Sequence, residues 1–172
     1  IIISTNGGLW RYMMGDTIVF TCLDPYRFRI SGRTKHFINV FGEEVIIDNA
    51  DKAIETACNA TGASIAEYTA GPVFMNTVSK GSHEWIIEFE REPSDFNNFI
   101  DILDDTLKSV NSDYEAKRYK DLNLVRPVCT SVPRGTFNKW LKVKNKFGGQ
   151  NKVPRLSNSR EYIEDLYIIA EI

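Results

Sequence analysis

Three short stretches of this chain contain residues suited to bind a ligand or take part in a reaction. In the first, Gly15 and Asp16 come directly before a run of alternating polar and apolar residues. Asp16 would therefore stand at the start of a strand, where its carboxylate could hold the two vicinal hydroxyls of a ribose. Gly15 would let the backbone approach such a ligand closely. An ordinary turn before a strand accounts for the same pattern.

The second stretch is framed by Gly32 and Gly42 and begins Gly-Arg-Thr-Lys-His. Glycine allows backbone conformations that other residues avoid, so two glycines around a mixed polar and apolar segment indicate a hinge followed by a loop. A simple linker with exposed charges is the alternative interpretation.

The third stretch, residues 149–155, places Lys152 two residues before Pro154. Because a proline restricts the backbone around it, this lysine could deliver its ammonium group to one fixed place. A solvated basic loop that docks an acidic partner would look the same. The neighbouring glycines do not form a Gly-x-x-x-x-Gly-Lys-Ser/Thr phosphate loop.

Hydrophobic periodicity predicts the secondary structure around these residues. Alternating residues on both sides of Asp24-Pro25 predict a β-hairpin. Helical spacing then predicts a helix over 46–57 and a longer one after Pro93, while residues 63–75 and 124–132 should be extended. Trp85, Ile87 and Phe89 alternate with Glu84, Glu88 and Glu90, which predicts a strand with one buried face.

The C-terminal third should add two more helices. A short one should carry Phe137 and Trp140, and Asn158 with Glu161 resembles a capping box for the last. The predicted fold class is therefore α+β: a hairpin followed by an open mixed β-sheet covered by helices.

Composition narrows the classes of function. The chain has 172 residues and a net charge of −2, which gives no electrostatic support for nucleic acid as a partner. No apolar run approaches the roughly 20 residues that span a bilayer, so we expect no membrane association. Three scattered cysteines favour reduced thiols in a cytoplasmic protein, and with only two histidines we expect no metal site.

Together the three stretches resemble the signature motifs of the adenylate-forming superfamily. Residues 8–16 resemble its Tyr-Arg-x-Gly-Asp motif, and residues 32–42 resemble its Gly-Arg-x-Asp/Lys-x-x-Ile-Lys-x-x-Gly hinge motif. Finer features are similar to the auxin-responsive (Gretchen Hagen) acyl-acid amido synthetase family, namely Gly-Leu-Trp-Arg-Tyr at residue 8, Gly-Thr-Phe at 135 and Gln-Asn-Lys-Val-Pro-Arg at 150. Met13 and Asn39 depart from the family pattern, which expects Arg and, in the wider superfamily, Lys.

The resemblance implies a role for each residue. Lys152 would be the catalytic lysine, Asp16 would bind the ribose of ATP, Arg33 would contact the nucleotide, and Lys35 would be the hinge. Such enzymes use ATP and Mg²⁺ to convert a carboxylic acid into an acyl-AMP, which an amino acid or another amine then attacks to form an amide.

The resemblance also implies a domain organisation. Residues 1–32 would be the end of an N-terminal catalytic domain, and residues 33–172 would be a mobile C-terminal lid domain whose partner is the N-terminal domain of the same chain. ATP and Mg²⁺ would be bound mainly by that N-terminal domain, and the fragment alone should be inactive. The three apolar residues at the start, Ile1 to Ile3, fit a strand cut from a larger domain.

Two other functions stay open. The chain could be a non-enzymatic α+β binding or regulatory module. It could also be the lid of a thioester-forming acyl-CoA ligase, although that class should end with a Pro-Arg-Thr-x-x-Gly-Lys pattern that this sequence lacks.

Overall fold

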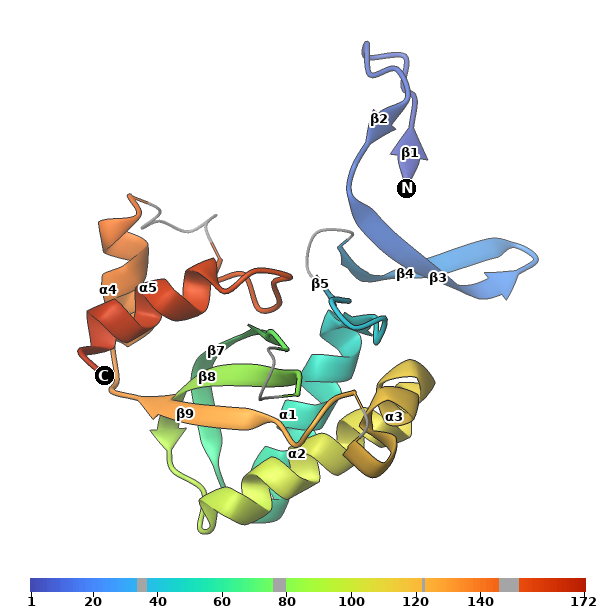
Figure 1. Cartoon of the computed structure of the whole chain (residues 1–172). Coiled ribbons are helices and arrows are strands. Elements are labelled where there is room, and N and C mark those ends of the chain that lie inside the picture. The colour runs from blue at the N-terminus through green and yellow to red at the C-terminus, as the bar shows by residue number, and fades with distance from the viewer. Residues whose placement is uncertain (34–36, 76–79, 122, 146–151) are drawn as a thin grey trace.

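The structure is a computed structural model that describes residues 1–33, 37–75, 80–121, 123–145 and 152–172. The predicted hairpin is confirmed as β3 (Asp16–Leu23) and β4 (Tyr26–Arg33), an antiparallel pair. A second small pair, β1 (Ile2–Ile3) and β2 (Tyr12–Met13), continues from it. Both pairs project away from the rest of the molecule (Figure 1).

The remaining elements form the main body of the molecule. Its sheet has the order β7-β8-β9, in which β8 is antiparallel to β7 and parallel to β9. The predicted α+β class with an open mixed sheet is therefore confirmed. The strands of the body are β5 (Phe37–Ile38), β6 (Val45–Ile46), β7 (Ser64–Val73), β8 (Ser82–Arg91) and β9 (Val128–Val132). The helices are α1 (Ile47–Thr61), α2 (Phe96–Val110), α3 (Ser112–Arg118), the 3-10 turn η1 (Tyr119–Asp121), α4 (Thr136–Val143) and α5 (Glu161–Ala170).

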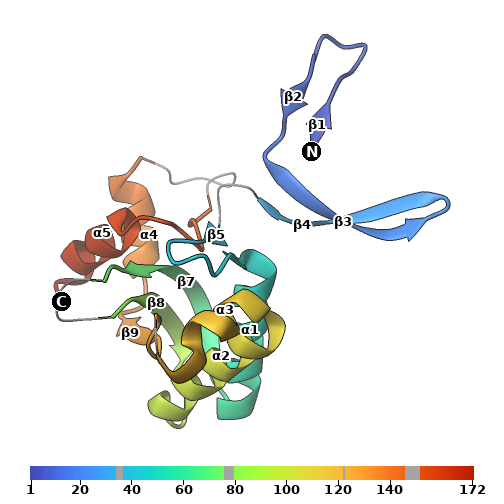
Figure 2. The same cartoon turned by 45° about the vertical axis from the view of Figure 1, so that its right-hand side comes forward.

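Helices cover the sheet on both faces. Helices α1, α2 and α3 lie on one side of the sheet, and α4 and α5 lie on the other (Figure 2). Each side has its own apolar core: Trp85, Ile87 and Phe89 of β8 face α1 and α2, while Ile86 faces α4 and α5. Successive side chains of β8 point to opposite faces of the sheet, as in any strand, and here each face packs into a core.

The expectation of one buried face for β8 is therefore wrong. Glu84 and Glu88 are only 6% and 5% exposed. Glu84 pairs with Arg160 at 2.7 Å, and Glu88 accepts hydrogen bonds from the backbone N–H groups of Gly135 (2.8 Å) and Phe137 (3.1 Å). A buried carboxylate is stable where charged or N–H partners replace water, and these partners lie far along the chain.

Glu88 acts as a cap for α4 supplied by another element. The N-cap of this helix is Gly135, at φ +89°, which has no side chain to accept a hydrogen bond from the N–H groups of the first turn.

Glu88→Ala is expected to lower the free energy of unfolding by about 2 kcal/mol, because two N–H groups lose their acceptor. Urea unfolding of the chain measures this change. The exposed Glu90 of the same strand is the matched control, and Glu90→Ala should stay within about 0.5 kcal/mol. Equal losses in the two variants would contradict the capping role.

The predicted capping box at Asn158 is also wrong. Helix α5 begins after Arg160, which has no side-chain cap bond. The side chain of Asn158 instead accepts a hydrogen bond from the N–H of Asn39 at 2.7 Å and donates one to the carbonyl of Phe37 at 3.1 Å. It therefore joins the segment before α5 to the first residues of the body.

None of the helices in the described ranges has the length and apolar character to cross a membrane. Cys22, Cys58 and Cys129 are all free and partly buried.

Candidate functional site

Asp16 and Arg33 occupy facing positions on the hairpin. Asp16 begins β3, as the sequence predicts, and its Cα is paired with that of Arg33 at the end of β4. The structure thus brings the two residues expected at the nucleotide to the same end of one antiparallel pair. Lys35, the expected hinge, lies outside the described residues.

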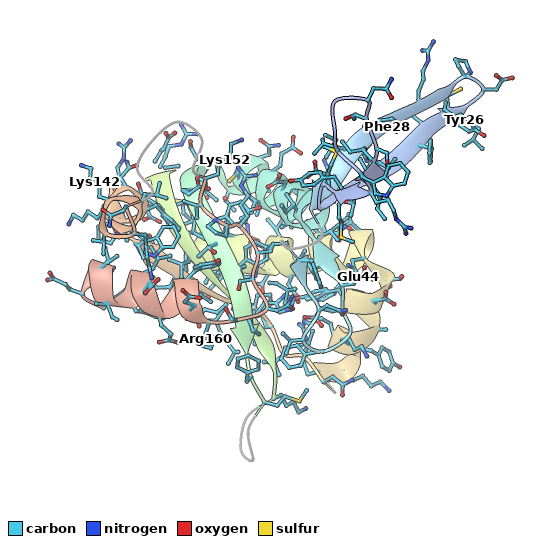
Figure 3. All side chains as sticks on the ribbon, turned by 90° about the horizontal axis from the view of Figure 1, so that it is seen from above. Tyr26, Phe28, Glu44, Lys142, Lys152 and Arg160 are labelled. Atoms are coloured by element: carbon cyan, nitrogen blue, oxygen red, sulfur yellow. The ribbon has the colours of Figure 1, made fainter. Side chains whose placement is uncertain are left out.

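Lys152 lies on the surface of the body. It is exposed, and it makes no hydrogen bond or ion pair with any residue in the described ranges. Figure 3 shows it in the body, apart from Tyr26 and Phe28 on the projecting hairpin. Its neighbour Val153 is buried in the core between the sheet, α4 and α5. The ammonium group of Lys152 is thus available to a ligand while the backbone beside it is held.

The lysine segment, residues 152–157, is attached along the edge of β7. The hydroxyl of Thr69 donates to the carbonyl of Pro154 at 2.7 Å, and the N–H of Ala70 donates to the carbonyl of Arg155 at 2.8 Å. The carbonyl of Ala70 in turn accepts from the N–H of Ser157 at 3.0 Å. The segment behaves as a short extra strand, in a parallel bridge with β7 at Leu156.

The side chain of Arg155 fixes the same segment to α1. Its Nη1 lies 2.6 and 2.8 Å from the two carboxylate oxygens of Asp51, and its guanidinium lies 5.2 Å from the centre of the Tyr68 ring. The Tyr68 hydroxyl donates to Asp51 at 2.6 Å. Burial, followed by the hydrogen bond to Asp51, raises the pKa of Tyr68 well above its usual value, so the hydroxyl keeps its proton and remains a donor.

A pocket of about 660 Å³ lies beside this cluster, where the hairpin meets the body. The hairpin contributes Arg29, which pairs with Asp48 at 3.0 Å. Burial raises the pKa of Glu67, another lining residue, above its usual value. The remaining lining residues are Asp51, Lys52, Ile54, Glu55, Ile65, Ala66, Tyr68, Val110 and Arg155.

The Arg29–Asp48 pair should stabilise the chain only weakly. The two side chains are 60% and 39% exposed, so Arg29→Ala is expected to change the free energy of unfolding by less than about 1 kcal/mol. The change should shrink in about 1 M NaCl, since salt screens exposed charges. Urea unfolding at low and high salt measures both effects. A loss well above this bound, unchanged by salt, would contradict the assignment as a surface pair.

Sequence reasoning missed Asp51 and Tyr68. On a helix, Asp51 looks like an ordinary solvated charge, and its partner Arg155 is more than one hundred residues away. The only signal was the spacing of Asp48 and Asp51, three residues apart, which places two carboxylates on the same face of α1.

Within the part of the chain that the structure describes, no group of three or more His, Cys, Asp or Glu side chains could hold a metal ion.

Comparison with known proteins gives the family. The sequence model of the GH3 family C-terminal domain matches residues 48–161, which is more than half of the chain. This chain belongs to the GH3 family. The matched range runs from α1 to the start of α5 and includes Lys152 and its attachments.

Solved structures of another GH3 protein share the fold. The chain superimposes on a structure of GH3.15 acyl acid amido synthetase with a TM-score of 0.74 and 20% sequence identity, covering 97% of this chain and 32% of that one. A structure of AtGH3.15 acyl acid amido synthetase in complex with 2,4-DB matches with a TM-score of 0.71, at the same identity and coverage. The chain therefore spans about a third of the length of these structures. The comparison with curated proteins finds no match.

Proposed function

We propose that this chain is the C-terminal part of an ATP-dependent acyl-acid amido synthetase, in which Lys152 is the catalytic lysine. The observation that carries the proposal is the placement of Lys152 in a GH3 C-terminal domain: its side chain is exposed and has no partner among the described residues, yet the residues after it are fixed to β7 and α1. A cation held in this way can act on a ligand brought by another domain.

The proposed reaction has two steps. In the first, an oxygen of the carboxylic acid attacks the α-phosphorus of ATP, and the bond to pyrophosphate breaks. Both reacting groups are anions, so an ammonium group between them lowers the barrier. Lysine suits this role because its charge is compact, whereas the arginine guanidinium favours planar, bidentate contacts. In the second step an amine nitrogen attacks the acyl carbon and loses a proton, and AMP leaves.

The other expected residues have supporting roles in this proposal. Asp16 accepts hydrogen bonds from the ribose hydroxyls of ATP, and Arg33, which faces it across the hairpin, contacts the nucleotide. Lys35 is the hinge between the N-terminal catalytic domain, whose end is residues 1–32, and the lid domain of residues 33–172. Mg²⁺ accompanies ATP and is bound mainly by the N-terminal domain. The enzyme is proposed to be cytoplasmic, with neither nucleic acid nor membrane as a partner.

The exposed apolar residues of the two projecting strand pairs support the N-terminal domain as the partner. Trp10 is 82% exposed and Tyr26 is 76% exposed. Figure 3 shows Tyr26 and Phe28 on the projecting hairpin, away from the body. Large apolar side chains exposed in this number mark an interaction site, and an N-terminal domain of the same chain would cover them. Other exposed apolar residues of these strand pairs are Tyr12, Met13, Phe20, Phe28 and Ile30.

ATP–pyrophosphate exchange tests the proposed function. The full-length protein should catalyse exchange with at least one acid from a panel of aryl and alkyl carboxylic acids that includes 2,4-DB. Addition of amino acids should then give an amide and AMP. The isolated chain should give no exchange, because a lid without the rest of the site stabilises no transition state. Exchange by the isolated chain would contradict this proposal, and failure of the full-length protein with every acid would favour a non-enzymatic binding module.

A further inference from the structure

Lys152 and Arg155 are joined by a short, stiff stretch of backbone. Only Val153 and Pro154 separate them. The ring of Pro154 fixes its own φ angle and keeps Val153 out of the helical region. Val153 is also packed in the core, at 7% exposure. The position of Arg155 therefore constrains where the backbone of Lys152 can lie.

Arg155 is itself held from two elements. Helix α1 provides Asp51, which contacts Nη1 with both carboxylate oxygens. Strand β7 provides the Tyr68 ring under the guanidinium and Glu67 at 3.9 Å from Nε. The hydroxyl of Tyr68 also donates to Asp51, which orients the carboxylate toward Arg155. Asp51 is the anion that both Arg155 and Tyr68 contact.

Helix α1 also connects this cluster to the hairpin. Asp48 precedes Asp51 by three residues, so both carboxylates lie on the same face of the helix. Asp48 pairs with Arg29 of β4, the strand that ends at Arg33 opposite Asp16. In this conformation one turn of α1 therefore contacts both Arg155 of the lysine segment and Arg29 of the hairpin. The same hairpin carries Asp16, the residue proposed to bind the ribose.

We propose that Asp51 is a positioning residue for adenylation: by holding Arg155 against Tyr68, it fixes the place of the Lys152 ammonium group. This inference rests on the proposed function of Lys152. In this role Asp51 acts through Arg155, so its loss should lower the rate of the chemical step while substrate binding changes little.

The test uses ATP–pyrophosphate exchange by the full-length protein. Asp51→Asn, which keeps the size of the side chain and removes its charge, should lower kcat about 10- to 100-fold, since small misplacements of a catalytic group cost that much. KM for ATP and for the acid should stay within about twofold. The matched control is Asp101→Asn. Asp101 is also a helical aspartate paired with an arginine, Arg126, at 2.6 Å and with similar exposure. The kcat of the Asp101→Asn variant should be unchanged.

A double variant separates positioning from general loss of structure. In the Lys152→Ala background, Asp51→Asn should lower the residual exchange less than about twofold, because the group that it positions is already absent. Tyr68→Phe, which removes one hydrogen bond and keeps the ring, should give a smaller fall in kcat with unchanged KM. This variant decides the question if Asp51→Asn does not fold.

Each contrary outcome has a separate meaning. If Lys152→Ala slows exchange about 100-fold or more while Asp51→Asn and Tyr68→Phe match the Asp101→Asn control, the positioning role is wrong and the proposed function stands. If Asp51→Asn lowers exchange equally with and without Lys152, its effect does not act through the lysine and the inference is again wrong. If Lys152→Ala keeps full exchange, the proposed role of Lys152 itself is wrong.

Discussion

Replacing Lys152 with alanine in the full-length protein is expected to slow ATP–pyrophosphate exchange about 100- to 1,000-fold, the usual cost of losing one fixed group that stabilises transition-state charge. Two anions meet in the adenylation step, and Lys152 has no described partner that would compete for its ammonium group. ATP affinity, measured by calorimetry, should change little, because the lysine acts where charge develops rather than where the nucleotide is held.

Two further variants show whether the effect belongs to this side chain. Lys152→Arg keeps the positive charge but changes its shape, so it should restore only part of the rate. Lys139 is exposed on α4 and belongs to the same basic stretch of sequence. Lys139→Ala should leave exchange unchanged. Equal losses for Lys139→Ala and Lys152→Ala would instead indicate a diffuse attraction of the basic surface for ATP.

Replacing His83 with alanine is expected to lower the free energy of unfolding by about 3–5 kcal/mol, because it leaves a buried carboxylate without its hydrogen-bond partner. His83 and Glu43 are both fully buried, with Nε2 of His83 2.9 Å from the Glu43 carboxylate. Glu43 also accepts a hydrogen bond from the N–H of Phe41 at 2.7 Å. The pair thus fixes the loop between β5 and β6 to strand β8. Urea unfolding measures the loss.

The double variant His83→Leu with Glu43→Leu is the control for this prediction. It removes both polar groups, so it should be less destabilised than His83→Ala. If the double variant lost as much as the sum of the single variants, the two residues would be independent and the buried pair would not explain the effect.

The pair should also make stability depend on pH. Burial by itself would raise the pKa of Glu43, but the hydrogen bond and charge of His83, together with two backbone N–H groups, hold the pKa below its usual value of 4.5. Because the pKa in the folded state is the lower one, Glu43 stabilises the fold above pH 4.5, and this contribution is lost as the pH falls through the lowered value. Glu43→Gln should remove that part of the acid dependence.

Local patterns were enough to predict most of the secondary structure and the fold class. The hairpin followed from alternation around Asp24-Pro25, and α1 and α2 followed from helical spacing. These elements each have a regular apolar face, and such a face depends only on neighbouring residues. Helix α3 was missed because its two buried residues, Tyr114 and Arg118, are stabilised by Asp104 of α2 rather than by an apolar stripe.

The parts that could not be predicted depend on long-range polar contacts. Glu84 and Glu88 look solvent-facing in sequence, and their burial becomes favourable through Arg160 and Tyr167 at Glu84 and the start of α4 at Glu88. Asn158 has the spacing of a helix cap but bonds to Phe37 and Asn39, more than one hundred residues earlier. At the candidate site, Lys152 and Asp16 could be singled out by motif, whereas the role proposed for Asp51 became visible only when Arg155 was placed beside it.

The two cores on either side of the sheet can also form only in a fixed order while the chain is being synthesised on the ribosome. The core beneath α1 and α2 is built almost wholly from residues between Ile38 and Leu124, which are synthesised early. The core on the other side needs Trp140, Val153 and the buried residues of α5. A growing chain can therefore pack one face of its sheet while the face carrying Ile86 stays uncovered until the last helix emerges. During that interval the nascent protein exposes an apolar surface, and chaperones that bind such surfaces would act on it then.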